Sequence, residues 1–277
     1  MKRRFSQVDV FTDMPLRGNA LAVVHDADGL SDTQMQDFAR WTNLSETTFL
    51  LRPVDPAADY RVRIFTPGSE VRFAGHPTLG SCHAWRAAGG VPRRAGQVVQ
   101  ECGVGLVPIR LSGDEAAFAA PPLTERPVTD ALLADVQRAL GVDASDVVAA
   151  QWLDNGMPWL VLQLTDAARV LAVTPDSAAI ARLGDVGLVG AHPDGAPAAF
   201  ELRAFAPSVG IAEDPVTGSL NASVAQWLMR RGVAPSRYVA AQGACVGRAG
   251  RIVLERDDEA LWVGGPTVGC IQGDVTL

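Results

Sequence analysis

Two titratable side chains in this sequence stand at the start of expected helices. His76 precedes Pro77 and Asp214 precedes Pro215, and proline favours the first turn of a helix. Histidine is a poor helix cap, whereas aspartate is a good one, so capping remains an alternative role for Asp214. An imidazole and a carboxylate at such positions could orient a small anion and take part in proton transfer.

A third candidate is Glu46, which lies between a tryptophan-containing helix end and an apolar strand. Partial removal of a carboxylate from water suits a group that takes up and returns a proton. The alternative is an exposed glutamate in a turn. The composition of this segment therefore makes Glu46 a candidate general acid and base.

The sequence argues against cofactor chemistry. Its four cysteines form no Cys-x-x-Cys pair, and the histidines lack the spacing of zinc ligands, so we expect no metal. The one lysine, Lys2, stands at the terminus, which excludes an internal Schiff base of the pyridoxal phosphate type. Neither a glycine-rich dinucleotide motif nor a Walker motif is present. We expect no cofactor.

The composition is that of a compact protein. The chain has 277 residues, of which 48% are hydrophobic and 20% charged, so it can bury a full core. Its net charge is 24 − 31 = −7, and it has no basic block, which argues against nucleic-acid binding. No apolar run approaches the roughly 20 residues of a membrane span, and no signal-peptide core is present. We therefore expect a cytoplasmic protein with no membrane partner.

Two pairs of segments align at a common offset. Subtracting 138 pairs residues 214–222 with 76–84, which share Pro, Gly, Ser and Ala at corresponding positions. The same subtraction pairs residues 156–161 with 18–23. The chain is therefore interpreted as two copies of one structural unit.

The repeat predicts an α+β fold with two pseudo-symmetric domains. Arg-x-Phe-x-Pro precedes each expected central helix, starting at Arg63 and Arg203. Small residues surround the start of each helix, so we expect each domain to be a curved sheet or barrel around its helix. The polar, proline-rich stretch PPLTERPVTD marks the boundary between domains 1–124 and 125–277. The final strand, 266–277, could return to the first domain.

Pseudo-symmetry would bring the two helix starts to one cleft. His76 and Asp214 would then occupy equivalent positions, and Ser219 would lie in the first turn of the second helix. Unpaired N–H groups at helix starts carry partial positive charge. We therefore expect a small anionic ligand, such as a carboxylate, between residues 75–77 and 217–220.

Four motifs, in this order, resemble those of the PhzF-like family of phenazine-biosynthesis proteins. They are GNALAV at 18–23, SETTF at 45–49, GHPTLG at 75–80 and EDPVTGS at 213–219. The resemblance extends over essentially the whole chain and implies the diaminopimelate-epimerase-like fold, in which the site lies between two similar domains. One departure is Ala20, where the family usually has proline after Gly-Asn.

The resemblance also implies roles for individual residues. Glu46 would move a proton between carbons of a cyclic dienoic amino acid, while His76, Asp214 and Ser219 position the substrate. Further residues of the implied substrate site are Asn19, Ser45, Gly75, Thr217 and Gly218, and backbone N–H groups near the two glycines would hold the carboxylate. Related epimerases and racemases use two cysteines, at places that align with Ala74 or its neighbour and with Asp214, so two-thiol racemisation is not expected.

The function expected from the sequence is a cofactor-independent isomerase or epimerase that moves a proton between carbons of a small carboxylated substrate, such as a cyclic diene. The alternative is a non-catalytic protein that binds small anions and retains the fold; it would not require Glu46. The family resemblance further implies a homodimer.

Overall fold

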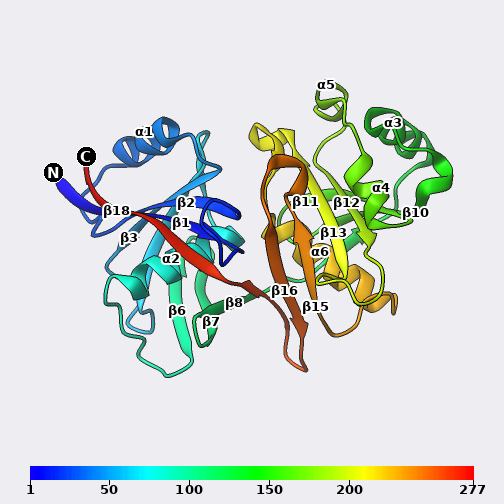
Figure 1. Cartoon of the computed structure of the whole chain (residues 1–277). Helices are drawn as coiled ribbons and strands as arrows, with labels where there is room; N and C mark the ends of the chain where they lie inside the picture. The colour runs from blue at the N-terminus through cyan, green and yellow to red at the C-terminus, as the bar shows by residue number, and fades with distance from the viewer. The chain divides into compact units, whose positions relative to one another are not determined.

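The computed structural model describes residues 1–277 and divides into two compact units (Figure 1). Unit 1 comprises Met1–Ala119 together with Gly264–Leu277, and unit 2 comprises Ala120–Val263. Each unit combines a mixed sheet with a few helices, which confirms the α+β fold class. None of the helices has the length and apolar character needed to cross a membrane.

Unit 1 is built on a mixed sheet whose strands pair in the order β18, β1, β2, β3, β4, β6, β7, β8. The pairs β2–β3 and β4–β6 are parallel, and the others are antiparallel. The strands are β1 (Lys2–Val10), β2 (Asn19–Val24), β3 (Glu46–Leu51), β4 (Tyr60–Phe65), β5 (Glu70–Val71), β6 (Gln97–Cys102), β7 (Gly105–Ser112), β8 (Glu115–Ala119) and β18 (Thr267–Thr276). The helices are α1 (Asp32–Thr42) and α2 (Gly75–Ala87).

Unit 2 repeats this plan. Its strands pair in the order β9, β10, β11, β12, β13, β15, β16, and the parallel pairs are β11–β12 and β13–β15. The strands are β9 (Thr124–Arg126), β10 (Val147–Asp154), β11 (Pro158–Leu164), β12 (Val186–Ala191), β13 (Phe200–Ala206), β14 (Ile211–Asp214), β15 (Arg237–Gln242) and β16 (Gly250–Arg256), with β17 (Leu261–Gly265) spanning the boundary to unit 1. The helices are α3 (Asp130–Leu140), α4 (Ala167–Ala172), α5 (Ser177–Ile180) and α6 (Gly218–Arg230).

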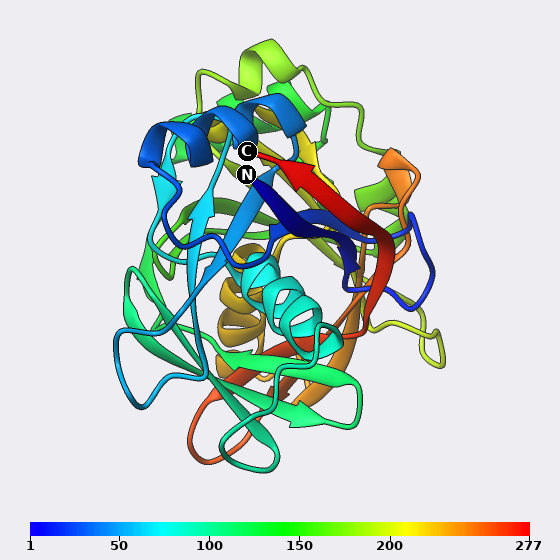
Figure 2. The ribbon, with the colours of Figure 1, turned by 90° about the vertical axis from the view of Figure 1, so that its left-hand side faces the viewer.

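Helix α2 is the centre of unit 1. It packs against β1, β2, β3, β6, β8 and β18, and Figure 2 shows it in cyan within the curve of these strands. Gly80 allows the close approach, because a Cβ atom at this position would lie 2.6 Å from Leu21 Cδ2 on β2. The small residues that the sequence places around this helix therefore let the sheet surround it.

Helix α6 has the corresponding role in unit 2 and contacts β10 and β16. Its residues from Leu220 to Leu228 are all buried. Leu220 packs against Gly187 of β12, where a Cβ atom would lie 2.4 Å from Leu220 Cδ1. Both central helices thus depend on a glycine contact with a neighbouring strand.

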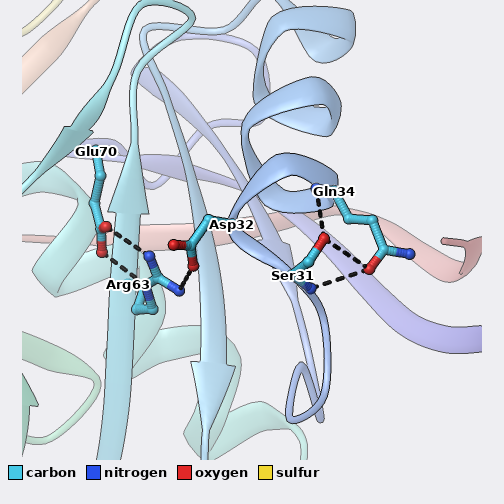
Figure 3. A network of polar contacts seen from close by, with 5 residues as sticks. All are labelled: Ser31, Asp32, Gln34, Arg63 and Glu70. Atoms are coloured by element: carbon cyan, nitrogen blue, oxygen red, sulfur yellow. Dashed lines mark hydrogen bonds and ion pairs between the residues drawn. The ribbon is translucent and has the colours of Figure 1, made fainter.

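The Arg-x-Phe-x-Pro motif has the same structural role in both units. Arg63 on β4 forms a bidentate pair with Glu70 on β5, at 2.7 and 2.6 Å, and also contacts Asp32 at the start of α1 (Figure 3). Arg203 on β13 pairs in the same way with Glu213 on β14, at 2.9 and 2.8 Å. Each arginine therefore ties the short strand that precedes a central helix to the main sheet.

Helix α1 begins after the N-cap residue Ser31. The Ser31 hydroxyl accepts a hydrogen bond from the Gln34 N–H, and the Gln34 side chain accepts one from the Ser31 N–H, which completes a capping box (Figure 3). The helix ends at Asn43, which adopts the left-handed conformation with φ of 53°. This turn leads the chain directly into Glu46, the first residue of β3.

Candidate active site

Glu46 and His76 lie together in unit 1. Glu46 is the first residue of β3, and His76 is the second residue of α2. Their Oε2 and Nε2 atoms are 3.5 Å apart, and the side chains are 18% and 6% exposed. The interpretation of Glu46 as an exposed turn residue is therefore wrong. A carboxylate and an imidazole that are 30 positions apart in sequence meet in a largely dry environment.

His76 is neutral at physiological pH. Burial lowers the pKa of its imidazole from 6.5 to about 3. The ring therefore brings no positive charge to Glu46, and the contact is that of a neutral imidazole with a carboxyl group. Such a ring can orient a carboxylate or a ligand by hydrogen bonding without forming an ion pair with it.

Hydroxyl groups fix the strand that carries Glu46. Thr47 Oγ1 lies 2.9 Å from Thr42 Oγ1 at the end of α1. The next residue, Thr48, accepts a hydrogen bond of 2.9 Å from Ser81 on α2. These contacts, one partly and one fully buried, connect β3 to both helices of the unit and limit the movement of the Glu46 backbone.

The start of α2 is not closed by a capping side chain. Its N-cap is Ala74, which has no hydrogen-bonding side chain, and Gly75 begins the helix. The Ala74 carbonyl accepts a hydrogen bond of 2.9 Å from Thr78 Oγ1, which itself accepts one of 3.0 Å from Gln100 Nε2. This network orders the first turn and leaves its N–H groups without a side-chain cap.

The other predicted residues of unit 1 lie on or beside the same strands. Asn19 is the first residue of β2 and is buried, opposite Val10. Ser45 is half-buried and directly precedes β3. Ala20, the departure from the family pattern, pairs with Asp9 in the β1–β2 ladder, so β2 forms with alanine at this position.

In unit 2, Asp214 belongs to a buried polar network. It is the last residue of β14, and its Oδ2 accepts a hydrogen bond of 2.5 Å from Thr217 Oγ1. The N-cap of α6 is Thr217, whose side chain makes no capping hydrogen bond to this helix. The N-cap position therefore belongs to Thr217 and not to Asp214, which lies three residues earlier.

Ser219, the second residue of α6, is oriented by two residues near the start of β11. Trp159 Nε1 donates to Ser219 Oγ at 3.2 Å, and Asn155 Nδ2 donates to the Ser219 carbonyl at 3.1 Å. Because the indole N–H occupies a lone pair of the hydroxyl, the Ser219 proton is directed to a different acceptor, and the Met157 sulfur lies 3.8 Å away. Gly218 begins the helix beside it.

The helix starts correct one alignment made from the sequence. An offset of 138 makes Asp214 the counterpart of His76. However, α2 begins at Gly75 and α6 at Gly218, an offset of 218 − 75 = 143, and both helices have 13 residues. By this measure the counterpart of His76 is Ser219. The offset of 138 matches Pro215 with Pro77 and Gly218 with Gly80. It does not hold for the helix starts, because the chain before α6 follows an extended path through β14 before it becomes helical.

The same comparison bears on thiol chemistry. The N-cap positions of the two central helices hold Ala74 and Thr217, so neither has a cysteine. Cys82 is buried within α2, and burial raises the pKa of its thiol to about 12, which keeps it protonated and unreactive. No group of three or more His, Cys, Asp or Glu side chains with the arrangement of a metal site is present among residues 1–277.

Sequence reasoning missed Gln242 and Trp159. Gln242 ends β15, is 1% exposed and hydrogen-bonds to Asp214 and Thr217. The signal available in the sequence was a glutamine at the end of the apolar strand Arg237–Gln242, where a buried amide requires several partners. The repeat aligns Trp159 with Leu21, an apolar residue, and so gives no signal for the hydrogen bond of its indole N–H.

Comparisons with known proteins show the family to which the chain is related. The family model of phenazine biosynthesis-like proteins (PhzC-PhzF) matches residues 8–273. Antisense-enhancing sequence 1 of Schizosaccharomyces pombe is 35% identical over 97% of both chains. The trans-2,3-dihydro-3-hydroxyanthranilate isomerase of Pseudomonas chlororaphis is 35% identical over 81% of this chain and 79% of its own.

A solved structure supports the fold. The phenazine biosynthesis protein of the PhzF family from Bacillus anthracis superposes over the whole of both chains with a TM-score of 0.88, at 21% sequence identity. The match in fold is therefore complete along the chain.

Proposed function

Because this chain belongs to the PhzF family of phenazine biosynthesis-like proteins and is an isomerase, we propose that it moves a proton between two carbons of a small carboxylated substrate through Glu46. The observation that carries the proposal is the contact between Glu46 and the neutral His76 at 3.5 Å. The isomerase relatives favour this function over a non-catalytic anion-binding protein.

The proposed chemistry needs one group that both accepts and returns a proton. Glu46, as a carboxylate, takes the proton from a carbon next to the double bonds of the substrate, and the electron pair of the broken C–H bond moves into the conjugated system. Glu46, now a carboxylic acid, gives the proton to another carbon of the same molecule and becomes a carboxylate again. Substrate and product are isomers, so no electron acceptor or second substrate is consumed.

His76 supports this cycle because it stays neutral. A protonated imidazole beside Glu46 would stabilise the carboxylate and make it a weaker base. The neutral ring leaves the basicity of Glu46 intact and can hydrogen-bond to the substrate or to the carboxyl group in either protonation state. Its burial, with 6% exposure of the side chain, maintains that neutral form.

The remaining predicted residues have binding roles in the proposal. Asp214 and Ser219 would orient polar groups of the substrate, and the N–H groups at Gly75 and Gly218, where the two central helices begin, would bind its carboxylate. Asn19, Ser45 and Thr217 would complete these surroundings. That both units contact one substrate stays a prediction, as do the cytoplasmic location and the homodimer.

The substrate class can be tested with the compound that the relatives transform. Purified protein is incubated with trans-2,3-dihydro-3-hydroxyanthranilate, and the positions of its double bonds are followed by NMR. We expect conversion of the acid and loss of conversion for the corresponding primary amide, which lacks the anionic carboxylate. Equal conversion of acid and amide would contradict carboxylate recognition, and no conversion of either would exclude this substrate.

The proposed homodimer has its own measurement. Light scattering at micromolar concentration should give about twice the 29.2 kDa mass of one chain. A monomer mass under these conditions would reject the dimer without affecting the proposed chemistry.

A further inference from the structure

Gln242 is the centre of the polar network at the start of α6. Its Oε1 accepts hydrogen bonds from the Thr217 N–H at 3.0 Å and from Asn221 Nδ2 at 2.9 Å. Its Nε2 donates to the Asp214 carbonyl at 3.0 Å and to Thr217 Oγ1 at 2.9 Å. All four hydrogen-bonding positions of this buried amide are thus used within one short segment.

The direction of these hydrogen bonds determines where the Thr217 proton points. An amide NH₂ group can only donate, so Thr217 Oγ1 accepts from Gln242. The single hydroxyl proton of Thr217 is then available for Asp214 Oδ2, which lies 2.5 Å away. The contacts form a directed chain from Gln242 through Thr217 to Asp214, and hydrogen bonds in such a chain strengthen one another.

The backbone around this chain is also held. Asn221 Nδ2 donates to the Thr217 carbonyl at 2.9 Å, so both peptide groups of Thr217 are engaged. The charged groups nearby, Arg203 on β13 and Glu213 on β14, are bound to each other at 2.9 and 2.8 Å. The Arg203–Glu213 pair therefore anchors β14 at the residue before Asp214. The Thr217 hydroxyl, three residues after Asp214, holds its side chain.

We propose that Gln242 is a positioning residue that acts through Thr217: it fixes the orientation of the Asp214 side chain and keeps that side chain in its carboxylate form. The catalytic consequence rests on the proposed function, in which Asp214 orients the substrate. The structural consequence does not, because the hydrogen-bonded chain belongs to the protein alone. A hydroxyl donor stabilises a carboxylate relative to the protonated acid.

The test compares Thr217→Val, which removes the hydroxyl at nearly constant volume, with Thr217→Ser, which restores it. The second pair is Gln242→Glu, which removes the two amide donors, and Ser208→Ala as the control. Ser208 Oγ donates to Asp185 Oδ2 at 2.5 Å, so the control deletes a hydroxyl–carboxylate bond of the same length outside the network. The ¹³C signal of the Asp214 carboxyl, assigned with Asp214→Asn, is titrated in each variant.

We expect Thr217→Val and Gln242→Glu to move the titration midpoint of Asp214 to higher pH by about one to two units, the amount that corresponds to one hydrogen bond to a charged group. Thr217→Ser and Ser208→Ala should leave the midpoint within about 0.3 units. If the isomerase reaction is found, kcat/KM should fall about tenfold in the first two variants and recover in Thr217→Ser.

The two readouts separate the proposals. A folded Thr217→Val protein with an unchanged Asp214 midpoint would overturn the positioning role, whatever its activity. A shifted midpoint in a protein with no isomerase activity would support the network and count against the proposed function. If Gln242→Glu does not fold, the Val and Ser variants of Thr217 decide the question by themselves.

Discussion

His76 Nε2 lies 3.5 Å from Glu46 Oε2, and two further residues set this distance. Glu46 pairs with Leu21 in the parallel β2–β3 ladder. Leu21 packs on Gly80, which is four residues after His76 on the same face of α2. The acid and the imidazole therefore meet because α2 can approach β2 closely at Gly80.

Gly80→Ala should disturb this approach. The added methyl group would lie 2.6 Å from Leu21 Cδ2 and 2.9 Å from Val10 Cγ2, so these buried side chains or α2 itself must shift. Overpacking of this kind costs about 1–3 kcal/mol of unfolding free energy, measured by urea denaturation. Gly273→Ala on β18, where nothing lies within 4 Å of the new Cβ, is the control and should change stability little. Equal stability of both variants with the wild type would contradict this packing.

Burial of His76 should make stability depend on pH. The unfolded chain binds a proton at this residue below pH 6.5, whereas the folded chain, with a pKa of about 3, does not. The free energy of unfolding therefore decreases as pH falls from 6.5 toward 3, and this contribution is absent above 6.5. At pH 4.5 it amounts to about 2–3 kcal/mol.

The variant His76→Gln removes this titration. Its unfolding free energy, measured by urea denaturation from pH 4.5 to 7.5, should change less with pH than that of the wild type. Parallel curves for the two proteins would show that His76 does not titrate differently in the folded and unfolded states.

The repeated arginine pairs allow a matched comparison. Glu213 is 12% exposed and binds an Arg203 that is 4% exposed, whereas Glu70 is 43% exposed beside Arg63. Removing one partner of a buried pair leaves an uncompensated charge and costs about 3–5 kcal/mol. Glu213→Gln should therefore lower unfolding free energy by about that amount.

The corresponding change in unit 1 should be milder. Glu70→Gln affects a pair that is open to solvent and should cost about 1 kcal/mol or less. Thermal and urea denaturation of both variants give the comparison. A larger loss of unfolding free energy for Glu70→Gln than for Glu213→Gln would contradict the claim that the buried Arg203–Glu213 pair contributes more to stability.

The repeat and the α+β class could be read from the sequence because they depend on local patterns. Arg-x-Phe-x-Pro, small residues at helix starts and the capping residue Ser31 each act within a few positions. The sequence also places Glu46 between a helix end and an apolar strand, and Glu46 is the first residue of β3. Local chemistry determined these features, so a single sequence was sufficient.

The helix register and the buried network could not be read in the same way. The extended path of β14 delays the start of α6 until Gly218, and only the pairing of β13 with β14 reveals this delay. Gln242 reaches Asp214 across 28 positions through the parallel β13–β15 pair. Contacts of this kind depend on strand order, which the repeat indicated only in outline.

The most direct test of the central claim is hydrogen exchange by Glu46→Gln in deuterated water. Wild type, Glu46→Gln and the exposed control Glu115→Gln are incubated with the substrate, and loss of C–H signal is followed by ¹H NMR. If Glu46 carries the proton, the Glu46→Gln rate should fall by about 10²–10⁴, the usual contribution of a general acid and base, while Glu115→Gln matches the wild type. Undiminished exchange in a folded Glu46→Gln protein would contradict the claim.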